Sequence, residues 1–415
     1  MADSSVSSRD EPSSIPGRGP LAPRLAALSA ARELVTERGF SVGVRDIAAA
    51  AGIDHAVVIR YFGSKAGLLD AVLATDGADL LAAVGEPGES GRGLRMVRQA
   101  RAGRQEALLV VRAGLDGRTE CDAHDLPVVR EWVEALKPER TPGTSEPLLT
   151  ASGAVFVAVS LAAGYAVLEP YERARVGHEF TRRDMDAFVG RSLDALLALP
   201  ERTDLPEGVM RSRRRQAAPE DGTRPAPSGP PPRGRDEVKQ AILDAAVDLF
   251  ASREIGAVSV RNIAKRARVN HSLLFRHFGS KEGVLRGAIQ RAADEIDAGL
   301  SATSTNGAGL LPVVRLIRGD SRIVVLTAQA LLSGYAIEDV QAEFPAASRM
   351  VAVLEEDRGR LAAMPAEAVV LCLTSLLFGS VLFETVLRSA TGMPAATDID
   401  VLVTDAAESM VELTR

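Results

Sequence analysis

The sequence is poor in cysteine and histidine, with two cysteines and five histidines among 415 residues. Cys121 and Cys372 are far apart, form no CxxC pair and have no histidine cluster near them. This pattern argues against a disulfide framework or a zinc site and fits a reducing cytoplasm. The sequence also lacks a phosphate-binding glycine loop and any metal-ligand spacing. We therefore expect no catalytic, metal or cofactor site, and an enzyme is disfavoured.

The sequence also lacks long hydrophobic runs. The N-terminus is rich in serine, proline and glycine, which predicts a disordered tail over residues 1–22 and not a secretory signal. Two apolar stretches, Gly153 to Leu168 and Ala366 to Phe383, are shorter than the roughly 20 residues that a bilayer span requires. Both carry hydroxyl residues and glycine, as closely packed helices do. We therefore expect core or interface helices and no membrane partner.

The net charge of −6 is unevenly distributed along the chain. Six basic and five acidic residues lie between Arg24 and Asp70, whereas nine basic and six acidic residues lie between Asp236 and Arg286. Salt screens the attraction of phosphates over about 10 Å, so a nucleic-acid-binding protein needs only a local positive face. The overall acidity does not exclude such a partner.

The two halves of the chain are copies of one another. At a spacing of 216 residues, 14 of the 29 positions from Ser41 to Leu69 are identical to their counterparts. The apolar stretches match at a spacing of 215 residues, so the duplication covers nearly the whole unit. The identical pairs include Val44/Val260, Arg45/Arg261, Ile47/Ile263, Ala48/Ala264, His55/His271, Arg60/Arg276, Phe62/Phe278, Lys65/Lys281, Gly67/Gly283, Ser160/Ser375, Gly164/Gly379 and Glu169/Glu384.

A segment between the copies, residues 200–235, is rich in proline, arginine and glycine and is too poor in apolar residues to build a core. It is predicted to be a solvated linker. The first copy then consists of an N-terminal head over 23–70 and a larger domain over 71–199. The second copy consists of a head over 236–286 and a larger domain over 287–415.

Each head shows the pattern of a helix-turn-helix. Apolar periodicity predicts a first helix over Arg24 to Arg38 and over Glu237 to Arg253. Ser259 with Asn262 predicts a capped start of the second helix, for which Gly43 with Asp46 is a weaker counterpart. Small Ala48 and Ala264 permit a close approach of the third helix.

The turn and the third helix complete the pattern. Gly52 is expected to end the second helix in a left-handed conformation, although the second copy has Arg268 there. A third helix is predicted over 55–62 and 271–278, ending at a glycine, and Ser64 and Ser280 are expected to cap a fourth. Two short helices joined by a three-residue turn form the helix-turn-helix motif.

Both heads resemble the DNA-binding domain of tetracycline-repressor (TetR) family regulators. The resemblance is carried by Val-Arg-x-Ile-Ala at 44–48 and 260–264, by Arg-[Tyr/His]-Phe-Gly-Ser-Lys at 60–65 and 276–281, and by the spacing between them. It implies an all-α fold in which each head is followed by an all-helical domain with a ligand pocket and two dimerisation helices. It also implies double-stranded DNA as the partner of a cytoplasmic regulator.

Carried over by position, the resemblance places the recognition helices at His55 to Tyr61 and at His271 to His277. Arginine can bind guanine with two hydrogen bonds, and lysine at a helix start can clamp a phosphate together with backbone amides. The phosphate-binding tyrosine frequent in the family is replaced by Ile59 and Phe275. The expected DNA contacts are Arg45, His55, Ala56, Val57, Ile59, Arg60, Tyr61 and Lys65 in the first copy and Arg261, His271, Ser272, Leu273, Phe275, Arg276, His277 and Lys281 in the second.

Each larger domain ends with an apolar helix and an amphipathic helix. These are expected over Ala151 to Glu169 and Asp184 to Leu199, and over Glu367 to Leu387 and Asp398 to Leu413. The resemblance suggests that they pair as a four-helix interface. Because both partners belong to one chain, at an effective concentration on the order of millimolar, we expect an intramolecular pseudo-dimer, with further homodimerisation left open. Non-identical heads in successive major grooves would bind an imperfect palindrome.

The resemblance also implies a small-molecule effector that releases a repressor from DNA. The middle regions, 94–137 and 310–356, would form its pocket, although packing residues are the alternative interpretation of their aromatic side chains. These side chains are Trp132, Phe156, Tyr165, Tyr335 and Phe344.

An alternative function class stays open: a ligand-binding or protein-binding helical pseudo-dimer in which one or both heads are degenerate. Ala56, Val57 and Ile59 give the first head an almost apolar face, suited to thymine methyl groups or to no specific base. Salt-dependent binding of duplex DNA separates the two classes.

Overall fold

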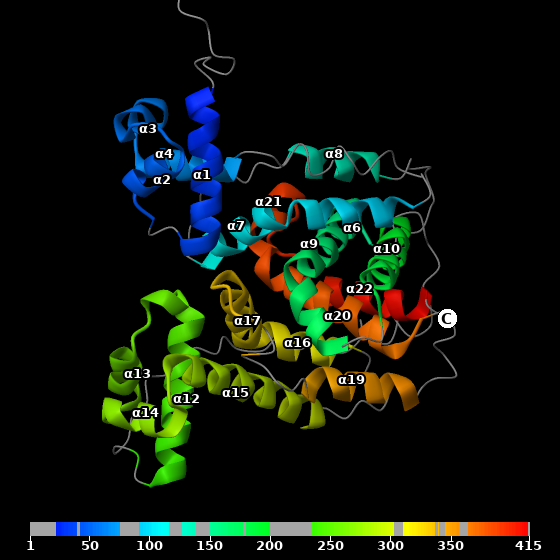
Figure 1. Cartoon of the computed structure of the whole chain (residues 1–415). Helices are drawn as coiled ribbons and strands as arrows, with labels where there is room; N and C mark the ends of the chain where they lie inside the picture. The colour runs from blue at the N-terminus through cyan, green and yellow to red at the C-terminus, as the bar shows by residue number, and fades with distance from the viewer. Residues whose placement is uncertain are drawn as a thin grey trace, which may run out of the picture. The chain divides into compact units, whose positions relative to one another are not determined.

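The computed structural model describes residues 22–39, 42–74, 91–115, 127–137, 149–176, 180–199, 232, 234–302, 310–336, 339, 345–356 and 364–413. Every regular element in these ranges is a helix (Figure 1). The all-α fold class predicted from the sequence is therefore confirmed. The chain divides into two compact units, residues 1–72 and residues 73–415, which are described separately. The predicted N-terminal tail, except Ala22 at the start of the first helix, and nearly all of the predicted linker lie outside the described residues.

The first unit is the first head. Its helices are α1 (Ala22–Arg38), α2 (Val44–Ala50), α3 (His55–Phe62) and the start of α4 (Lys65–Ala74). The predicted second helix ends where expected, because Gly52 adopts a left-handed φ of 65°. Ile47, Val58 and Leu68 have no exposed surface, so one apolar side chain from each short helix builds the core.

The second head lies in the second unit, at the start of the second copy. It repeats the architecture of the first head. It consists of α12 (Arg235–Ser252), a 3₁₀ turn (Ile255–Ala257), α13 (Val260–Ala267), α14 (His271–Phe278) and the start of α15 (Lys281–Ala302). Phe250, Ile263 and Leu274 are buried between them. The continuous helix α15 then runs from the head into the larger domain of the second copy (Figure 1).

Polar contacts fasten the second head to its own larger domain. The side-chain oxygen of Gln329 on α17 (Arg322–Leu332) accepts the backbone N–H of Ile255 at 3.1 Å. Arg322 at the start of α17 forms an ion pair of 2.8 Å with Glu295 of α15. The head is thus held at the 3₁₀ turn and through α15.

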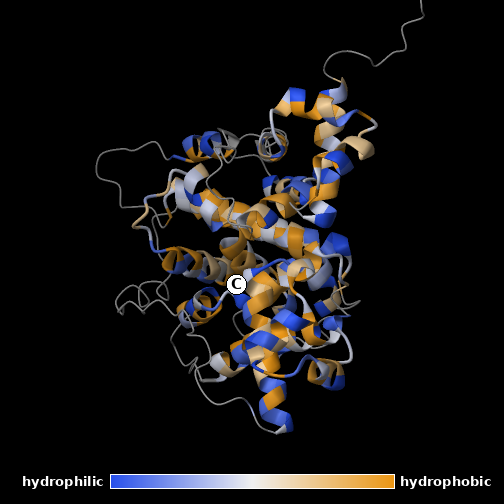
Figure 2. Ribbon diagram, turned by 90° about the vertical axis from the view of Figure 1, so that its left-hand side faces the viewer, coloured by the Kyte–Doolittle hydropathy of each residue, from blue (hydrophilic) through white to orange (hydrophobic). Residues whose placement is uncertain are grey.

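The remaining helices of the second unit come from both copies. In the first copy they are α6 (Arg92–Ala102), α7 (Arg104–Leu115), α8 (Pro127–Ala135), α9 (Ala151–Val176) and α10 (Arg182–Ala198). In the second copy they are α16 (Leu311–Gly319), α17, α19 (Pro345–Glu356), α20 (Ala366–Leu382), α21 (Glu384–Ala390) and α22 (Ile399–Leu413). Apolar residues of these helices, orange in Figure 2, form one shared core.

The equivalent helices α9 and α20 cross in the middle of this core (Figure 1). A Cβ atom at Gly164 would overlap the carbonyl oxygen of Ser375, and a Cβ atom at Gly379 would overlap the carbonyl oxygen of Ser160. Glycine permits this approach of the two backbones. Because the two glycines and the two serines are repeat equivalents, the contact is reciprocal, as across a two-fold axis.

Helices α10 and α22 flank the crossing, and each contacts both α9 and α20. Polar bonds join the copies at several points around this four-helix contact. The Ser152 hydroxyl donates to the carbonyl of Thr391 at 2.9 Å, and Arg112 donates to the carbonyl of Leu332 at 3.0 Å. The rings of Tyr171 and Phe378 lie 5.9 Å apart. The four predicted helices therefore meet in the part of the chain that the structure describes.

Helix α9 is the one described helix that is by itself long and apolar enough to cross a membrane. Within the chain, however, 83% of its apolar window is buried. Such burial is typical of the core helix of a folded domain. The apolar stretch Gly153 to Leu168 is thus a core helix, as predicted.

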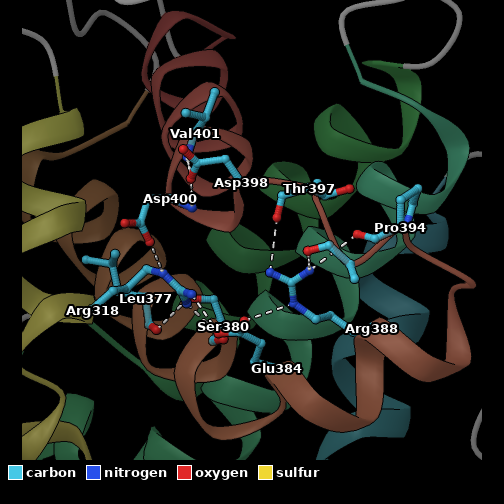
Figure 3. A network of polar contacts seen from close by, with 11 residues as sticks. Arg318, Leu377, Ser380, Glu384, Arg388, Pro394, Thr397, Asp398, Asp400 and Val401 are labelled. Carbon is cyan, nitrogen blue, oxygen red and sulfur yellow. Dashed lines mark hydrogen bonds and ion pairs between the residues drawn. The ribbon is translucent and has the colours of Figure 1, made fainter. Parts of the chain in front are cut away.

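The predicted helix from Glu367 to Leu387 is wrong, because the chain bends by 77° between α20 and α21. Arg318 of α16 lies at this bend and donates to the carbonyl oxygen of Ser380 at 3.0 Å (Figure 3). In a continuous helix that carbonyl would accept the N–H of Glu384. Arg318 replaces this bond and also pairs with the carboxylates of Glu384 and Asp400, each at 2.7 Å.

Helix α9 differs from its prediction in the opposite direction, since it continues past Glu169 to Val176 although Pro170 lies inside it. Proline has no N–H, which leaves the carbonyl of Ala166 without its helical partner. Arg104 of α7 supplies the missing donor at 3.0 Å. An arginine from a neighbouring helix thus satisfies a carbonyl of the apolar helix in both copies.

Candidate nucleic-acid interface

The recognition helices α3 and α14 have the same start and the same end. The side chain of Asp54 accepts the N–H of Ala56 at 2.7 Å, and the side chain of Asn270 accepts the N–H of Ser272 at 3.0 Å. Gly63 and Gly279 close the helices with φ values of 72° and 74°. Each recognition helix is therefore capped by its own local sequence.

One buried residue anchors each recognition helix, Val58 in α3 and Leu274 in α14. The opposite faces lie at the surface, which leaves their side chains accessible to a ligand. The exposed residues are His55, Ala56, Ile59 and Arg60 in the first head and His271, Ser272, Phe275 and Arg276 in the second. Val57, Tyr61, Leu273 and His277 are half-buried at the edges of these faces.

The exposed faces carry large apolar side chains at equivalent positions. Ile59 has 39% and Phe275 has 53% of its surface exposed, and both are among the exposed large hydrophobic residues of the described chain. Neither side chain belongs to the hydrophobic core of its head. A surface position on a recognition helix suits contact with a thymine methyl group.

Arg60 and Tyr61 form a pair on the first recognition helix. The guanidinium carbon of Arg60 lies 5.5 Å from the centre of the Tyr61 ring. Such a contact positions a cation over an aromatic face. In the second head His277 replaces this tyrosine and lies beside Phe278, with ring centres 6.3 Å apart.

Helices α2 and α13 each carry an exposed arginine in the first turn, Arg45 or Arg261. In α13 the Ser259 hydroxyl accepts the N–H of Asn262 at 3.1 Å, and the Asn262 side chain accepts the N–H of Ser259 at 3.0 Å. At the start of α2 only one of these two bonds exists, because glycine has no hydroxyl. The side chain of Asp46 accepts the N–H of Gly43 at 3.3 Å. The predicted difference between the two starts is therefore confirmed.

A lysine begins the fourth helix of each head, as predicted. The hydroxyls of Ser64 and Ser280 accept the N–H groups of Gly67 and Gly283 at 3.0 and 3.1 Å. The ammonium group of Lys281 also donates to the carbonyl of Ile255. Burial lowers the pKa of Lys281, an effect that the nearby carboxylate of Glu282 opposes.

The aromatic residues expected near an effector pocket lie on different elements. Phe156 and Tyr165 are fully buried in α9, and the Tyr165 hydroxyl donates to Asp186 at 2.9 Å. Trp132 on α8 and Tyr335 after α17 are half-buried. Phe344 lies outside the described residues. The effector pocket stays a prediction.

The two helix caps, Asp54 and Asn270, were not predicted from the sequence. Each is an aspartate or asparagine directly before a recognition helix, which is a recognised N-cap signal. Each carries a side-chain oxygen at the surface beside the expected DNA contacts, so the difference between a carboxylate and an amide changes the charge of the interface.

Comparison with known proteins identifies the family to which the heads belong. A family model described as bacterial regulatory proteins, tetR family, matches residues 27–72 and 242–288. The chain is 38% identical over 188 residues to the HTH-type transcriptional repressor Rv3405c of Mycobacterium tuberculosis, which covers 44% of this chain and 93% of that protein. The HTH-type transcriptional regulator Mb3439c of Mycobacterium bovis matches to the same extent.

A more distant relative matches a shorter stretch. The HTH-type transcriptional regulator AlkX of Mycobacterium tuberculosis is 29% identical over 59 residues, which covers 14% of this chain and 28% of that protein. The match to the nearer relatives is 188 residues long, which is close to the length of one copy of the repeat. The chain therefore belongs to the tetR family of bacterial regulatory proteins and carries the DNA-binding domain of that family twice.

Proposed function

We propose that a single molecule of this chain acts as a complete transcriptional repressor. It would be equivalent to a dimer of two separate subunits that each carry one DNA-binding domain. The observation that carries the proposal is the reciprocal crossing of α9 and α20, in which Gly164 meets Ser375 and Gly379 meets Ser160. An interface of this kind brings equivalent surfaces of two copies together. Two DNA-binding domains then belong to one covalently linked pseudo-dimer.

The DNA contact is proposed on the exposed faces of α3 and α14. Arg60 and Arg276 would donate to phosphate or to guanine, and the lysines at the starts of α4 and α15 would clamp a phosphate together with the backbone N–H groups there. The two faces differ at Ile59 and Phe275 and at Tyr61 and His277. An imperfect palindrome is the operator that such a protein would prefer.

Repression is favoured over activation by one relative, which is named a transcriptional repressor. Release by a small-molecule effector bound in a larger domain is part of the same proposal. A transcriptional regulator must reach the chromosome, so a cytoplasmic location is part of the proposal.

Footprinting with each recognition helix altered separately tests this function. We expect Arg60→Ala to weaken protection at one half-site and Arg276→Ala to weaken protection at the other, each at a cost of about 1–3 kcal/mol in binding. Equal losses at both half-sites from one substitution would argue against two independent heads. Unchanged protection after Arg60→Ala would favour the alternative in which the first head is degenerate.

A further inference from the structure

Three basic residues form a line along the surface of the second head. Arg261, Lys265 and Arg268 follow one another at spacings of four and three residues, which places them on one side of α13 and its C-terminal turn. All three are exposed. The opposite side of α13 is buried through Ile263, Ala264 and Ala267. We call the three residues the basic ridge.

The ridge differs from the other charged residue of this helix. Arg266 lies outside the line and forms an ion pair of 2.7 Å with Asp248 of α12, so its charge is used inside the head. Among the described residues, neither Arg261 nor Lys265 has an ion-pair partner. Their charges are therefore presented to the solvent.

The backbone conformation of Arg268 is a second observation that bears on the ridge. Its φ of 58° is the one positive φ of a non-glycine residue in the described part of the chain. The equivalent residue in the first head is Gly52, with a φ of 65°, where no side chain is strained. Strained backbone conformations cluster at functional sites, so the conformation of Arg268 directs attention to its side chain.

The turn itself does not explain the arginine. In the second head the N–H of Val269 bonds to the carbonyl of Ala264 at 3.0 Å, and in the first head the N–H of Ile53 bonds to the carbonyl of Ala48 at 3.0 Å. The same backbone turn thus forms with glycine and with arginine. Glycine would form it without strain.

The first head has no equivalent ridge. Arg45 is followed at the same spacings by Ala49 and Gly52. Its two caps, Asp46 and Asp54, carry carboxylates where the second head has the neutral amides of Asn262 and Asn270. Around the second recognition helix two cations are added and two anions are missing, while one anion, Glu282, is added where the first head has Ala66. The surface there is therefore more positive than in the first head.

We infer that the basic ridge is a further binding site for DNA-backbone phosphates, which makes the second head the stronger electrostatic anchor of the protein. The ridge lies on the first helix of the helix-turn-helix, the helix that crosses the DNA backbone in this motif. The inference rests on the proposed function, since it adds Lys265 and Arg268 to Arg261, which is already an expected contact with the same duplex.

The ridge is tested by the salt dependence of duplex binding. The full-length protein and its Arg268→Gly and Lys265→Ala variants are titrated with a labelled duplex that the unaltered protein has selected from a randomised pool. Each lost phosphate contact lowers the slope of log affinity against log salt by about 0.9, which reduces the loss of affinity between 50 and 200 mM salt about 3.5-fold. We expect this change in both variants.

Arg183→Ala is the matched control, because it removes an exposed cation from α10 in a larger domain. We expect it to keep the original slope. The unfolding midpoint of Arg268→Gly should equal or exceed that of the unaltered protein, since glycine relieves the strain. A stable Arg268→Gly variant that binds less tightly separates a ligand contact from a structural role.

Ridge variants whose slopes match that of Arg183→Ala would overturn the inference while leaving duplex binding intact. Failure of the unaltered protein to select or retain any duplex would instead contradict the proposed function.

Discussion

Gly379 of α20 approaches Ser160 of α9 so closely that a single methyl group at Gly379 would overlap the Ser160 carbonyl oxygen. Gly164 and Ser375 repeat this relationship on the other side of the crossing. The contact joins residues more than 200 positions apart in the chain. It is one of the links between the two copies on which the proposed pseudo-dimer depends.

Enlarging Gly379 should separate these helices. We expect Gly379→Ala to lower the free energy of unfolding by at least about 2 kcal/mol, because backbone atoms cannot move aside as a flexible side chain does. The midpoint of urea unfolding, followed by circular dichroism, measures the loss. Gly114→Ala in α7 is the matched control, since no atom lies within 4 Å of its added Cβ and alanine favours a helix by about 0.5–1 kcal/mol. Equal effects of the two substitutions would argue against a tight crossing.

The guanidinium of Arg318 stabilises the bend between α20 and α21. Its side chain is 8% exposed, and its partners Glu384 and Asp400 are about one-third exposed. We expect Arg318→Met to cost about 2–3 kcal/mol, less than a fully buried pair would, because solvent reaches the carboxylates. Arg349→Met removes an ion pair in which the arginine side chain is 45% exposed and Asp297 is 23% exposed, so it should cost much less than Arg318→Met. Thermal unfolding of both variants measures the difference, and equal costs would contradict a structural role for Arg318.

The buried carboxyl of Glu172 should make stability depend on pH. Burial raises the pKa of Glu172 above its ordinary value of 4.5, and the neighbouring Arg175 only partly opposes this rise. The folded protein then keeps this proton to a higher pH than the unfolded chain does, so its contribution to stability falls as the pH rises from 4.5 through the folded pKa. Glu172→Gln cannot lose a proton and should not show this decline.

Urea unfolding of Glu172→Gln and of the unaltered protein, measured between about pH 4.5 and pH 8, tests this dependence. The stability of the variant relative to the unaltered protein should rise with pH. Glu134→Gln, at a carboxyl that is 68% exposed, serves as the control and should show no such trend. A difference between Glu172→Gln and the unaltered protein that stays constant with pH would contradict the raised pKa.

Phe275 offers a test of the second recognition helix that spares the core. Because 53% of its surface is exposed, Phe275→Tyr should change the free energy of unfolding by less than about 0.5 kcal/mol. The added hydroxyl can donate to a phosphate, so we expect duplex binding to tighten by about 0.5–1.5 kcal/mol. Fluorescence anisotropy measures the affinity. Identical affinities of Phe275→Tyr and the unaltered protein would place this side chain away from the DNA.

The heads could be predicted from the sequence because their determinants are local. Ser64 and Ser280 cap the fourth helices, and Gly63 and Gly279 end the recognition helices, so neighbouring residues alone fix the helix boundaries. The same kind of signal was present at Asp54 and was missed. Helical periodicity predicted the exposure of His55, Ala56, Ile59 and Arg60 correctly. It did not predict that Val57 and Tyr61 are half-buried.

The larger domains were less predictable because distant residues decide their helix boundaries. Neither proline nor glycine marks the bend at Phe383, where Arg318 supplies the decisive hydrogen bond from 62 residues away. Proline is present in α9 but does not end it, since Arg104 satisfies the carbonyl that Pro170 leaves unpaired. Local sequence signals thus missed the end of α20 and gave too early an end for α9. In each case a tertiary contact replaces a hydrogen bond of the helix.

The number of chains bound to one duplex tests the central claim most directly. Light scattering coupled to size-exclusion chromatography gives the mass of the complex with a duplex that carries both half-sites. We expect one chain of 43.8 kDa per duplex, with both half-sites protected in a footprint of the same complex. Two chains on each duplex, or one chain that protects a single half-site, would contradict it.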